Sequence, residues 1–448
     1  MKKFFGTDGI RGKTGAYPVT PDFFVRLGYA AGLVLTKKIE ANKKPSVVIG
    51  KDTRISGYML ESALEAGFSA AGVDVYLTGP IPTPAVAYLT QSLNADIGIM
   101  ITASHNPYQD NGMKLFSKEG SKLSDEIEHQ IEAVIESEIT CVDPMKLGKA
   151  RRLDNAREQY IDFCLKTPPA CINLKGYKIV LDCAHGATYQ VAPEIFKRLG
   201  AELIIINDKP DGLNINHNAG STHPELLIQS VKSQGADLGV AFDGDGDRVI
   251  MVSDRGEVID GDQILYLIMD YYHQKNSLKG GVVGTLMTNL ALEEKCKSLG
   301  VPFERTSVGD RYVSERLREK SWFVGGENSG HIVLLNHHST GDGIISSLQT
   351  ILALLEKNKK ISEILQGMPM YPQVLINIPL ENKIDLNSKA IQDATEVAEN
   401  MMNGLGRVLI RASGTQPLLR VMTEGPEMVS TEKAANFLVN QIKSLSEH

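Results

Sequence analysis

The stretch ADLGVAFDGDGDR at residues 236–248 joins an apolar strand directly to a loop in which aspartate and glycine alternate. Two similar strands precede it, YKIVLDCAHG at 177–186 and AELIIIND at 201–208, and a helical stretch follows each of them. Near-continuous apolar strands joined by helices are typical of sheets that are covered on both faces. The stretch therefore predicts a mixed α/β sheet with a polar loop at the end of its last strand.

The same plan of strand, helix, strand, helix and strand occurs in two further parts of the chain, although the residues differ. The strands of these copies are SVVIG at 46–50, VDVYL at 73–77 and DIGIMITAS at 96–104, then GGVVGT at 280–285, VPFERT at 301–306 and WFVGGENSGH at 322–331. Gly72, Gly200 and Gly300 stand at equivalent helix-to-strand junctions. A helix often ends in a left-handed residue, for which glycine is suited. We therefore expect three sheets of similar topology.

The last part of the chain has a different order of predicted strands and helices. It offers three strand candidates and a terminal helix, and the strands are PQVLINIP at 372–379, GRVLIRAS at 406–413 and LLRVMTEG at 418–425. The predicted fold class is thus α/β, with three successive mixed α/β sheet domains of similar topology plus a C-terminal α+β domain around a central cleft. The predicted domains are residues 1–150, 151–255, 256–370 and 371–448.

Polar loops follow the third strand of each copy, namely TASHNP, DGDGDR and GGENSGH. In open α/β sheets, ligands bind beyond the carboxyl ends of the strands. These three loops, with a fourth from the last domain, are therefore expected to converge on one cleft.

Composition and charge exclude several classes of protein. The 448 residues include 47 Lys and Arg against 54 Asp and Glu, for a net charge of −7, which argues against a broad nucleic-acid or anionic-membrane surface. Local arginines and backbone amides could still bind an anionic substrate.

The five cysteines form no CxxC pair, so no disulfide framework or zinc ribbon is expected. The N-terminus lacks a signal-peptide pattern and no apolar run reaches about 18 residues, so we expect a cytoplasmic protein.

The DGDGDR loop is the strongest chemical signal. Asp243, Asp245 and Asp247 are two residues apart, and the glycines between them let the backbone aim three carboxylates at one point. Oxygen ligands of this kind suit a hard cation such as Mg²⁺. A calcium loop of the EF-hand kind fits poorly, because Arg248 replaces the required glycine and Asp254 the final glutamate. A phosphatase with a nucleophilic aspartate and a solvated acidic turn remain as alternatives.

The TASHNP loop contains a candidate nucleophile. Ser104 is followed by His105, Asn106 and the rigid Pro107, and Lys114 lies ten residues after it. A serine needs a neighbouring base or metal to act as a nucleophile. If phosphorylated, it would carry a charge of about −1.5 to −2 and offer oxygen to a cation. A lone serine after a strand is usually a turn or cap residue, and the loop by itself does not decide between the two roles.

The RASGTQP segment resembles a cradle for an anion. Arg411 offers a forked pair of donors, Ser413 and Thr415 offer hydroxyls, and Gly414 permits close approach of the backbone. A β-turn with a surface arginine explains the segment about as well.

Two further loops carry candidate binding residues. GTDGIRG, near the start, places Arg11 between glycines, as a phosphate contact or as part of a flexible turn. GGENSGH supplies Glu327, Ser329 and His331, whose donors and acceptors suit sugar hydroxyls. The alternative is a capped loop with one satisfied histidine.

Together and in this order, GTDGIRG, TASHNP, DGDGDR, GGENSGH and RASGTQP resemble the α-D-phosphohexomutase family along nearly the whole chain. The resemblance implies four domains around a central cleft, a phosphoserine at Ser104, and one Mg²⁺ per chain held by Ser104, Asp243, Asp245 and Asp247. It also implies a sugar 1,6-bisphosphate as intermediate and activator, and by analogy a homodimer through the first domain.

The same resemblance assigns roles to the other candidates. The catalytic group would comprise the proton-transferring Lys114, His105, and Arg11 and Arg248, which stabilise charge on the transferred phosphoryl. Residues that would bind the sugar and its second phosphate are Glu327, Ser329, His331, Arg411, Ser413, Gly414 and Thr415.

Finer marks favour the branch of the family that acts on hexosamine phosphates. Asp8 in GTDGIRG, Asn328 in GGENSGH and the segment SVGDRYV at 307–313 resemble that branch, which interconverts glucosamine 6-phosphate and glucosamine 1-phosphate. Gln416 departs from its pattern, where glutamate is common, and this puts any specific role of that carboxylate in doubt.

Three other functions stay open at this point. A phosphomannomutase or phosphoglucomutase would share the chemistry and differ in the sugar. A phosphatase would use Asp243 and leave Ser104 unmodified. A non-catalytic paralogue would bind a sugar phosphate, although this sequence retains every chemical group that the reaction needs.

Overall fold

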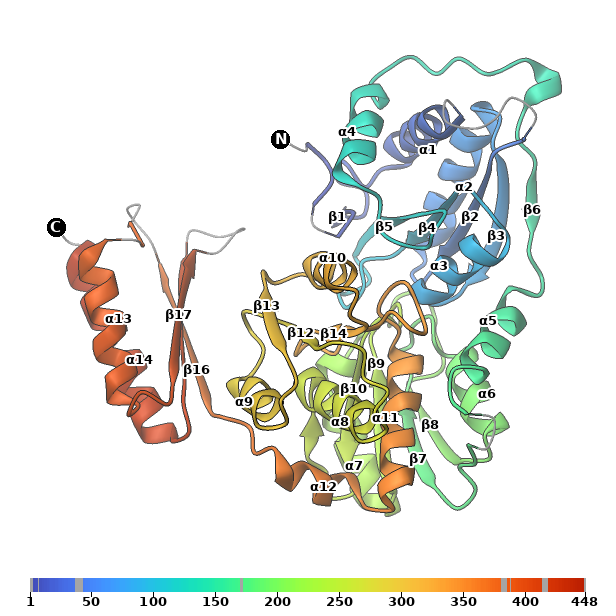
Figure 1. The fold of residues 1–448 in the computed structure, drawn as a ribbon. Helices are drawn as coiled ribbons and strands as arrows, with labels where there is room; N and C mark the ends of the chain where they lie inside the picture. The colour runs from blue at the N-terminus through green and yellow to red at the C-terminus, as the bar shows by residue number, and fades with distance from the viewer. Residues whose placement is uncertain are drawn as a thin grey trace.

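The computed structural model describes residues 3–6, 8–36, 43–169, 172–379, 385–386, 388–412 and 418–446. Four sheets follow one another along this part of the chain. In Figure 1 the first sheet lies above the second and third, which pack against each other, and the fourth stands to one side. The three mixed α/β sheets of similar topology and the C-terminal α+β domain confirm the predicted fold class.

The first sheet has six strands, the last of which, β6, follows a long connection. In spatial order they are β1 (Ile10–Lys13), β5 (Asp110–Ser117), β4 (Ile97–Ile101), β2 (Ser46–Lys51), β3 (Asp74–Pro80) and β6 (Ala150–Arg152). Its helices are α1 (Pro21–Thr36), α2 (Ser56–Ala70), α3 (Thr83–Ser92), α4 (Asp125–Val134) and the short η1 (Pro144–Lys146).

The second sheet has the order β11 (Val258–Ile259), β10 (Val249–Ser253), β9 (Leu238–Phe242), β7 (Lys178–Asp182) and β8 (Glu202–Ile206). It is accompanied by α5 (Ala156–Leu165), α6 (Val191–Arg198), η2 (Gly220–Thr222) and α7 (Glu225–Gln234). The third sheet has the order β13 (Phe303–Thr306), β12 (Val282–Thr285), β14 (Val324–Gly326) and β15 (Ile332–Leu334). Its helices are α8 (Gly261–Gln274), α9 (Leu290–Ser298), α10 (Asp310–Lys320), α11 (Gly343–Lys357), α12 (Ile361–Ile364) and η3 (Leu365–Gly367).

A group of three parallel strands recurs in each of these sheets, as the sequence pattern predicts. The groups are β3-β2-β4, β8-β7-β9 and β13-β12-β14. Gly72, Gly200 and Gly300 have φ angles of 84°, 91° and 68°, which confirms the left-handed helix ends. An antiparallel strand then follows each group, in the pairs β4–β5, β9–β10 and β14–β15. Each of the three polar loops is therefore the connection of a hairpin at the carboxyl end of a parallel group.

The fourth sheet contains β16 (Gln373–Pro379), β18 (Leu418–Glu424) and β17 (Arg407–Ala412), in that order, and packs against α13 (Lys389–Met401) and α14 (Met428–Ser446). The three strands and α14 match the predicted elements. The sequence pattern did not predict α13. Its buried face is formed by Ile391, Ala394 and Ala398, which recur at helical spacing, so the sequence did carry a signal for this helix.

Polar contacts at one end of the fourth sheet join it to the third domain. Arg407 forms an ion pair with the buried Glu424 and donates to the carbonyl of Leu286 at 2.8 Å. Glu424 in turn accepts from the backbone N–H of Leu290 at 2.8 Å. Asn289 adds a paired contact with the backbone of Tyr371, at 2.9 and 3.1 Å.

Hydrophobic burial divides the chain into unequal parts. The largest core cluster draws buried residues from three sheets, among them Met100, Val240 and Val282. A separate cluster belongs to the fourth domain, where Leu438 is fully buried. No helix in the described ranges has the length and apolar character that crossing a bilayer demands. The second domain, the third domain and one side of the first therefore share a core that the fourth does not, and the rest of the first domain has a core of its own around Ile49.

We expect core truncations to separate these parts. Leu348→Ala in α11 and Leu438→Ala in α14 each remove a fully buried side chain, which should cost about 2–5 kcal/mol of unfolding free energy. Trp322 is the single tryptophan and lies in the third domain. The denaturant concentration at the midpoint of unfolding, followed by its fluorescence, should therefore fall in Leu348→Ala. In Leu438→Ala, only the part of the circular dichroism transition that belongs to the fourth domain should move to lower denaturant, and the fluorescence midpoint should stay. The exposed Leu405→Ala is the control, and a fluorescence shift in Leu438→Ala would contradict the separation.

Candidate active site

The serine loop connects β4 to β5 and holds Ser104 in an unusual conformation. Ser104 has a φ of 53°, a left-handed value that is uncommon outside glycine, and its side chain is buried. Its N–H donates to the hydroxyl of Thr102 at 2.8 Å. Its own hydroxyl donates to the Oδ2 atom of Asp243 at 2.7 Å. The predicted serine is therefore in direct contact with the predicted metal loop.

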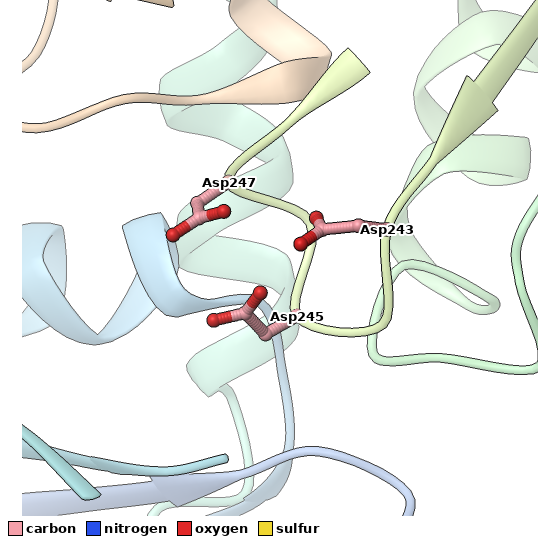
Figure 2. A group of neighbouring side chains, drawn as sticks. All are labelled: Asp243, Asp245 and Asp247. Carbon is pink, nitrogen blue, oxygen red and sulfur yellow. The ribbon is translucent and has the colours of Figure 1, made fainter. Parts of the chain in front are cut away.

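The metal loop connects β9 to β10 and brings three carboxylates together. Figure 2 shows Asp243, Asp245 and Asp247 around one turn of the backbone, and one oxygen of each lies within 4.8 Å of the others. Glycines are needed in this turn, because a Cβ on Gly244 would lie 2.7 Å from the carbonyl oxygen of Ser104. Gly246 has a φ of 71°. The loop thus has the curled backbone that its sequence predicts.

The three carboxylates fit a hard divalent cation. All are buried, and the Oδ1 atoms of Asp245 and Asp247 have no hydrogen-bond partner among the described residues. Burial, with repulsion from Asp245 and Asp247, raises the pKa of Asp243 well above its usual value. A bound cation would relieve this repulsion and provide the oxygens with a partner. The loop follows a strand, unlike an EF-hand loop, which follows a helix.

Lys114 projects from β5 onto the same aspartates. Its Nζ donates to Asp245 at 2.9 Å and to Asp247 at 2.6 Å. Burial opposes the charged amine, but the carboxylates of Asp245 and Asp247 hold the pKa of Lys114 well above its usual value. The first sheet therefore supplies an ammonium group to the metal loop of the second.

His331 reaches the metal loop from the third sheet. Its Nδ1 lies 3.7 Å from Asp247 Oδ2, and its Nε2 lies 3.6 Å from Asp310. Burial disfavours the imidazolium, but Asp247 and Asp310 raise the pKa of His331 above its ordinary value. Burial likewise opposes ionisation of Asp247, while Lys114 and His331 hold the pKa of this carboxyl well below its usual range.

Asp8 and Arg11 belong to a chain of charges beside this cluster. Asp8 forms ion pairs with Arg11 and Lys122, and Lys122 donates to Asp310 at 2.6 Å. Although burial opposes ionisation, Lys114, Lys122 and Arg11 lower the pKa of Asp8. Asp8 is thus already neutralised by cations of the protein.

His105 lies next to the serine hydroxyl, with Nδ1 3.4 Å from Ser104 Oγ. Burial, with the positive charges of Arg248 and Arg11, lowers the pKa of His105 to about 4. The imidazole is therefore neutral at pH 7, and the lowered pKa makes it a weak base.

The GGENSGH loop is tied to the second domain. The N–H of Val249 donates to the carbonyl of Gly330 at 3.0 Å. Glu327 accepts from the N–H of Gly309 at 2.9 Å. The hydroxyl of Ser329 and the Nε atom of Arg248 are buried and have no partner among the described residues. Ser329 of this loop and Arg248 at the end of the metal loop therefore each offer a donor without a partner among the described residues.

The phosphate-loop prediction is only partly described. Arg411 lies on β17, and burial with the charge of Arg420 lowers its pKa. Among the described residues, no hydrogen bond or ion pair joins Arg411 to the other three loops. Ser413, Gly414, Thr415 and Gln416 lie outside the described residues.

The sequence pattern missed several residues of this region. Thr83, from the start of α3, donates its hydroxyl to Asp245. Arg54 and Asn216 bind the backbone of the serine loop, and Lys122 pairs with Asp310. Arg54 follows β2, so the rule that ligands bind beyond strand ends could have found it if applied to the first strand of the repeat. No comparable signal marks the others.

Comparisons with known proteins agree with this geometry. Models of phosphoglucomutase/phosphomannomutase domains match the chain in four parts, namely α/β/α domain I at residues 2–140, domain II at 158–256, domain III at 260–371 and the C-terminal domain at 375–441. The phosphoglucosamine mutase of Methylobacillus flagellatus is 54% identical over 438 residues, 97% of each chain. That of Aeromonas hydrophila is 53% identical over 444 residues, 99% of each chain.

Solved structures show the same fold. A phosphoglucomutase/phosphomannomutase family protein from Burkholderia thailandensis matches with a TM-score of 0.82 and 25% identity, over 99% of this chain and 98% of that one. The N-acetylphosphoglucosamine mutase of Aspergillus fumigatus, in complex with GlcNAc-6P and magnesium, matches with a TM-score of 0.68 and 18% identity, over 100% and 96%. The four domain matches and the full-length relatives agree on one assignment. The chain belongs to the α-D-phosphohexomutase family of phosphoglucomutases and phosphomannomutases.

Proposed function

We propose that this chain interconverts glucosamine 6-phosphate and glucosamine 1-phosphate through a phosphoserine at Ser104 and a sugar 1,6-bisphosphate. The observation that carries the proposal is the contact of 2.7 Å between the serine hydroxyl and Asp243, inside a buried group of three carboxylates. The choice of sugar is supported by full-length relatives named phosphoglucosamine mutase, at 51–54% identity.

The proposed cofactor is Mg²⁺, one per chain. Asp243, Asp245 and Asp247 would hold it together with an oxygen of the phosphate on Ser104. When bound, the ion supplies positive charge that offsets the charge of the phosphoryl oxygens. The partnerless oxygens of Asp245 and Asp247 support this assignment.

In the first half-reaction, the bond between Ser104 Oγ and phosphorus breaks while phosphorus bonds to a free hydroxyl of the sugar phosphate. The hydroxyl loses its proton as the new bond forms, and the serine oxygen gains one. Such a transfer depends on alignment and on stabilisation of charge more than on covalent chemistry by the protein. Arg11, Arg248 and Lys114 would provide cations for this purpose.

In the second half-reaction, the other phosphoryl group of the bisphosphate returns to Ser104, and the serine hydroxyl must lose its proton. Two acceptors lie beside it. Asp243 Oδ2 accepts the hydroxyl hydrogen bond at 2.7 Å, and the neutral His105 lies at 3.4 Å. Lys114, held as an ammonium group by the aspartates, would donate a proton to the sugar oxygen as this phosphoryl group leaves it, and the proton lost by Ser104 restores the balance.

The remaining site residues would hold the substrate. We assign the sugar to Glu327, Ser329 and His331, and the non-reacting phosphate to Arg411, Ser413, Gly414 and Thr415. The bisphosphate must present each phosphate to Ser104 in turn, and arginines and hydroxyls tolerate such a turn better than a closely shaped pocket. We also propose a cytoplasmic location, and a homodimer through the first domain by analogy with the family.

Replacing the serine tests the covalent step. Ser104→Ala should abolish both mutase activity and phosphate incorporation, since no other group replaces the phosphoryl acceptor. The exposed Ser137→Ala is the matched control and should retain both. Activity assays and intact-mass measurement with peptide mapping would check this. Near-normal turnover in Ser104→Ala would exclude the phosphoserine mechanism.

Changing one carboxylate tests the metal site. Asp245→Asn should weaken the activation by Mg²⁺ by roughly tenfold or more, because a charged ligand is lost. Phosphoryl transfer should fall with it, and Asp154→Asn, on an exposed residue, is the control. The readouts are a Mg²⁺ titration of activity and direct metal binding by calorimetry. Full activity of the wild-type chain after thorough chelation would contradict the assignment.

Comparing substrates tests the sugar. The highest kcat/KM is expected on glucosamine 6-phosphate, with lower values on mannose 6-phosphate and glucose 6-phosphate. A preference for either of the latter would assign the chain to another activity of the same family. Release of inorganic phosphate in place of an isomer would instead indicate a phosphatase.

A further inference from the structure

The backbone of the serine loop is held by two side chains that bind the same two carbonyl groups. Arg54 donates through Nη2 to the carbonyl oxygens of Ser104 at 3.2 Å and of Asn106 at 2.6 Å. Asn216 donates through Nδ2 to the same two oxygens, at 2.9 Å each. We call these two side chains the carbonyl clamp.

Arg54 belongs to the first domain and is fully buried. Its guanidinium forms an ion pair with Asp52, which is also buried, and its backbone N–H donates to Asp52 Oδ1 at 2.9 Å. Because the side chain is fixed by this pair, its remaining donors face a constant direction. They point at the serine loop.

Asn216 belongs to the second domain and is also buried. It has a φ of 58°, and its backbone N–H donates to the carbonyl of Ala184 at 2.9 Å, which fixes its place in the loop before η2. A Cβ on Gly244 of the metal loop would lie 2.7 Å from its Nδ2 atom. Asn216 therefore contacts both the serine loop and the metal loop.

The clamp acts on a backbone that is strained at one residue. A left-handed φ is unfavourable for a residue other than glycine, so surrounding contacts must hold it. At Ser104 this conformation directs the hydroxyl to Asp243. The clamp binds the carbonyl of the strained residue itself and that of the residue two positions later.

We propose that Arg54 and Asn216 are positioning residues for phosphoryl transfer, which hold Ser104 in register with the metal loop of the next domain. This inference rests on the proposed function of Ser104. Neighbouring contacts tie the same segments together, since Thr53 donates to the carbonyl of His185 at 2.6 Å and Ile55 N–H to that of Gly212 at 3.0 Å. Loss of one clamp residue should therefore move the serine without separating the domains.

Asn216→Asp is the main test. Aspartate has nearly the same shape and tolerates a left-handed backbone, but as a carboxylate it cannot donate to the two carbonyls. Asn218→Asp is the matched control, because Asn218 lies in the same loop with a φ of 49° but is exposed. A misplacement of about 1 Å can cost roughly 10²-fold in rate, so we expect kcat to fall by about that factor in Asn216→Asp, with KM within about twofold.

The rate of transfer from phosphorylated Ser104 separates positioning from a merely structural role. The phosphoenzyme is mixed with saturating sugar phosphate, and loss of phosphate from Ser104 is followed by rapid quench and mass spectrometry. The rate should fall in Asn216→Asp and stay at the wild-type value in Asn218→Asp. Asn216→Gly, which accepts the same backbone and adds no charge, should show the same loss if Asn216→Asp folds poorly.

The outcomes are distinct. Equal transfer rates in Asn216→Gly and the wild-type chain would overturn the clamp, and so would a rise of KM that accounts for the whole loss of kcat/KM. In either case wild-type transfer from Ser104 leaves the proposed function intact. If the wild-type chain itself transfers no phosphate from Ser104, the proposed function fails and the clamp with it.

Discussion

Repulsion among three buried carboxylates is the constraint on which the rest of this structure depends. Asp243, Asp245 and Asp247 lie within 4.8 Å of one another and are shielded from water, where like charges repel most strongly. The protein offsets part of this charge with Lys114 from the first sheet and His331 from the third. Because the negative charge of the second domain's loop is balanced by side chains of the first and third domains, the same attraction holds the three domains together. Its remaining negative charge is what makes it suitable for a divalent cation.

The repeated hairpin explains why loops from three domains lie around one site. In each of the first three sheets a parallel group ends in a loop and returns as an antiparallel strand, so the loop lies at the carboxyl end of the group. The same local topology presents Ser104 in one domain, three carboxylates in the next and Glu327, Ser329 and His331 in the third. Chemistry differs because the loop residues differ, while the scaffold that aims them is the same.

Local sequence predicted the elements that depend on local pattern. The apolar strands, the glycines at helix ends and the aspartate loop all follow from residues close together in the chain, and the structure contains them. The antiparallel strands β5, β10 and β15 were missed because their pairing depends on the neighbouring strand in the folded sheet and not on a pattern in their own residues. Asn216 was missed for a similar reason, since its partners at Ser104 and Asn106 lie 112 and 110 residues away. The helix α13 was missed although Ile391, Ala394 and Ala398 recur at helical spacing, so local pattern could have predicted it.

The attachment of the fourth domain has a mechanical consequence. Its polar contacts with the third domain gather at Glu424 and Arg407, which are paired at one end of the sheet. Leu418 stands at the other end of β18, next to the RASGTQP segment, and seven residues of strand span about 20 Å. A rotation of the fourth domain about the buried ion pair of Arg407 and Glu424 would therefore displace the opposite end of β18 the most. A turn of about 10° at Glu424 would carry Leu418 through roughly 3 to 4 Å, the scale of one hydrogen bond made or lost.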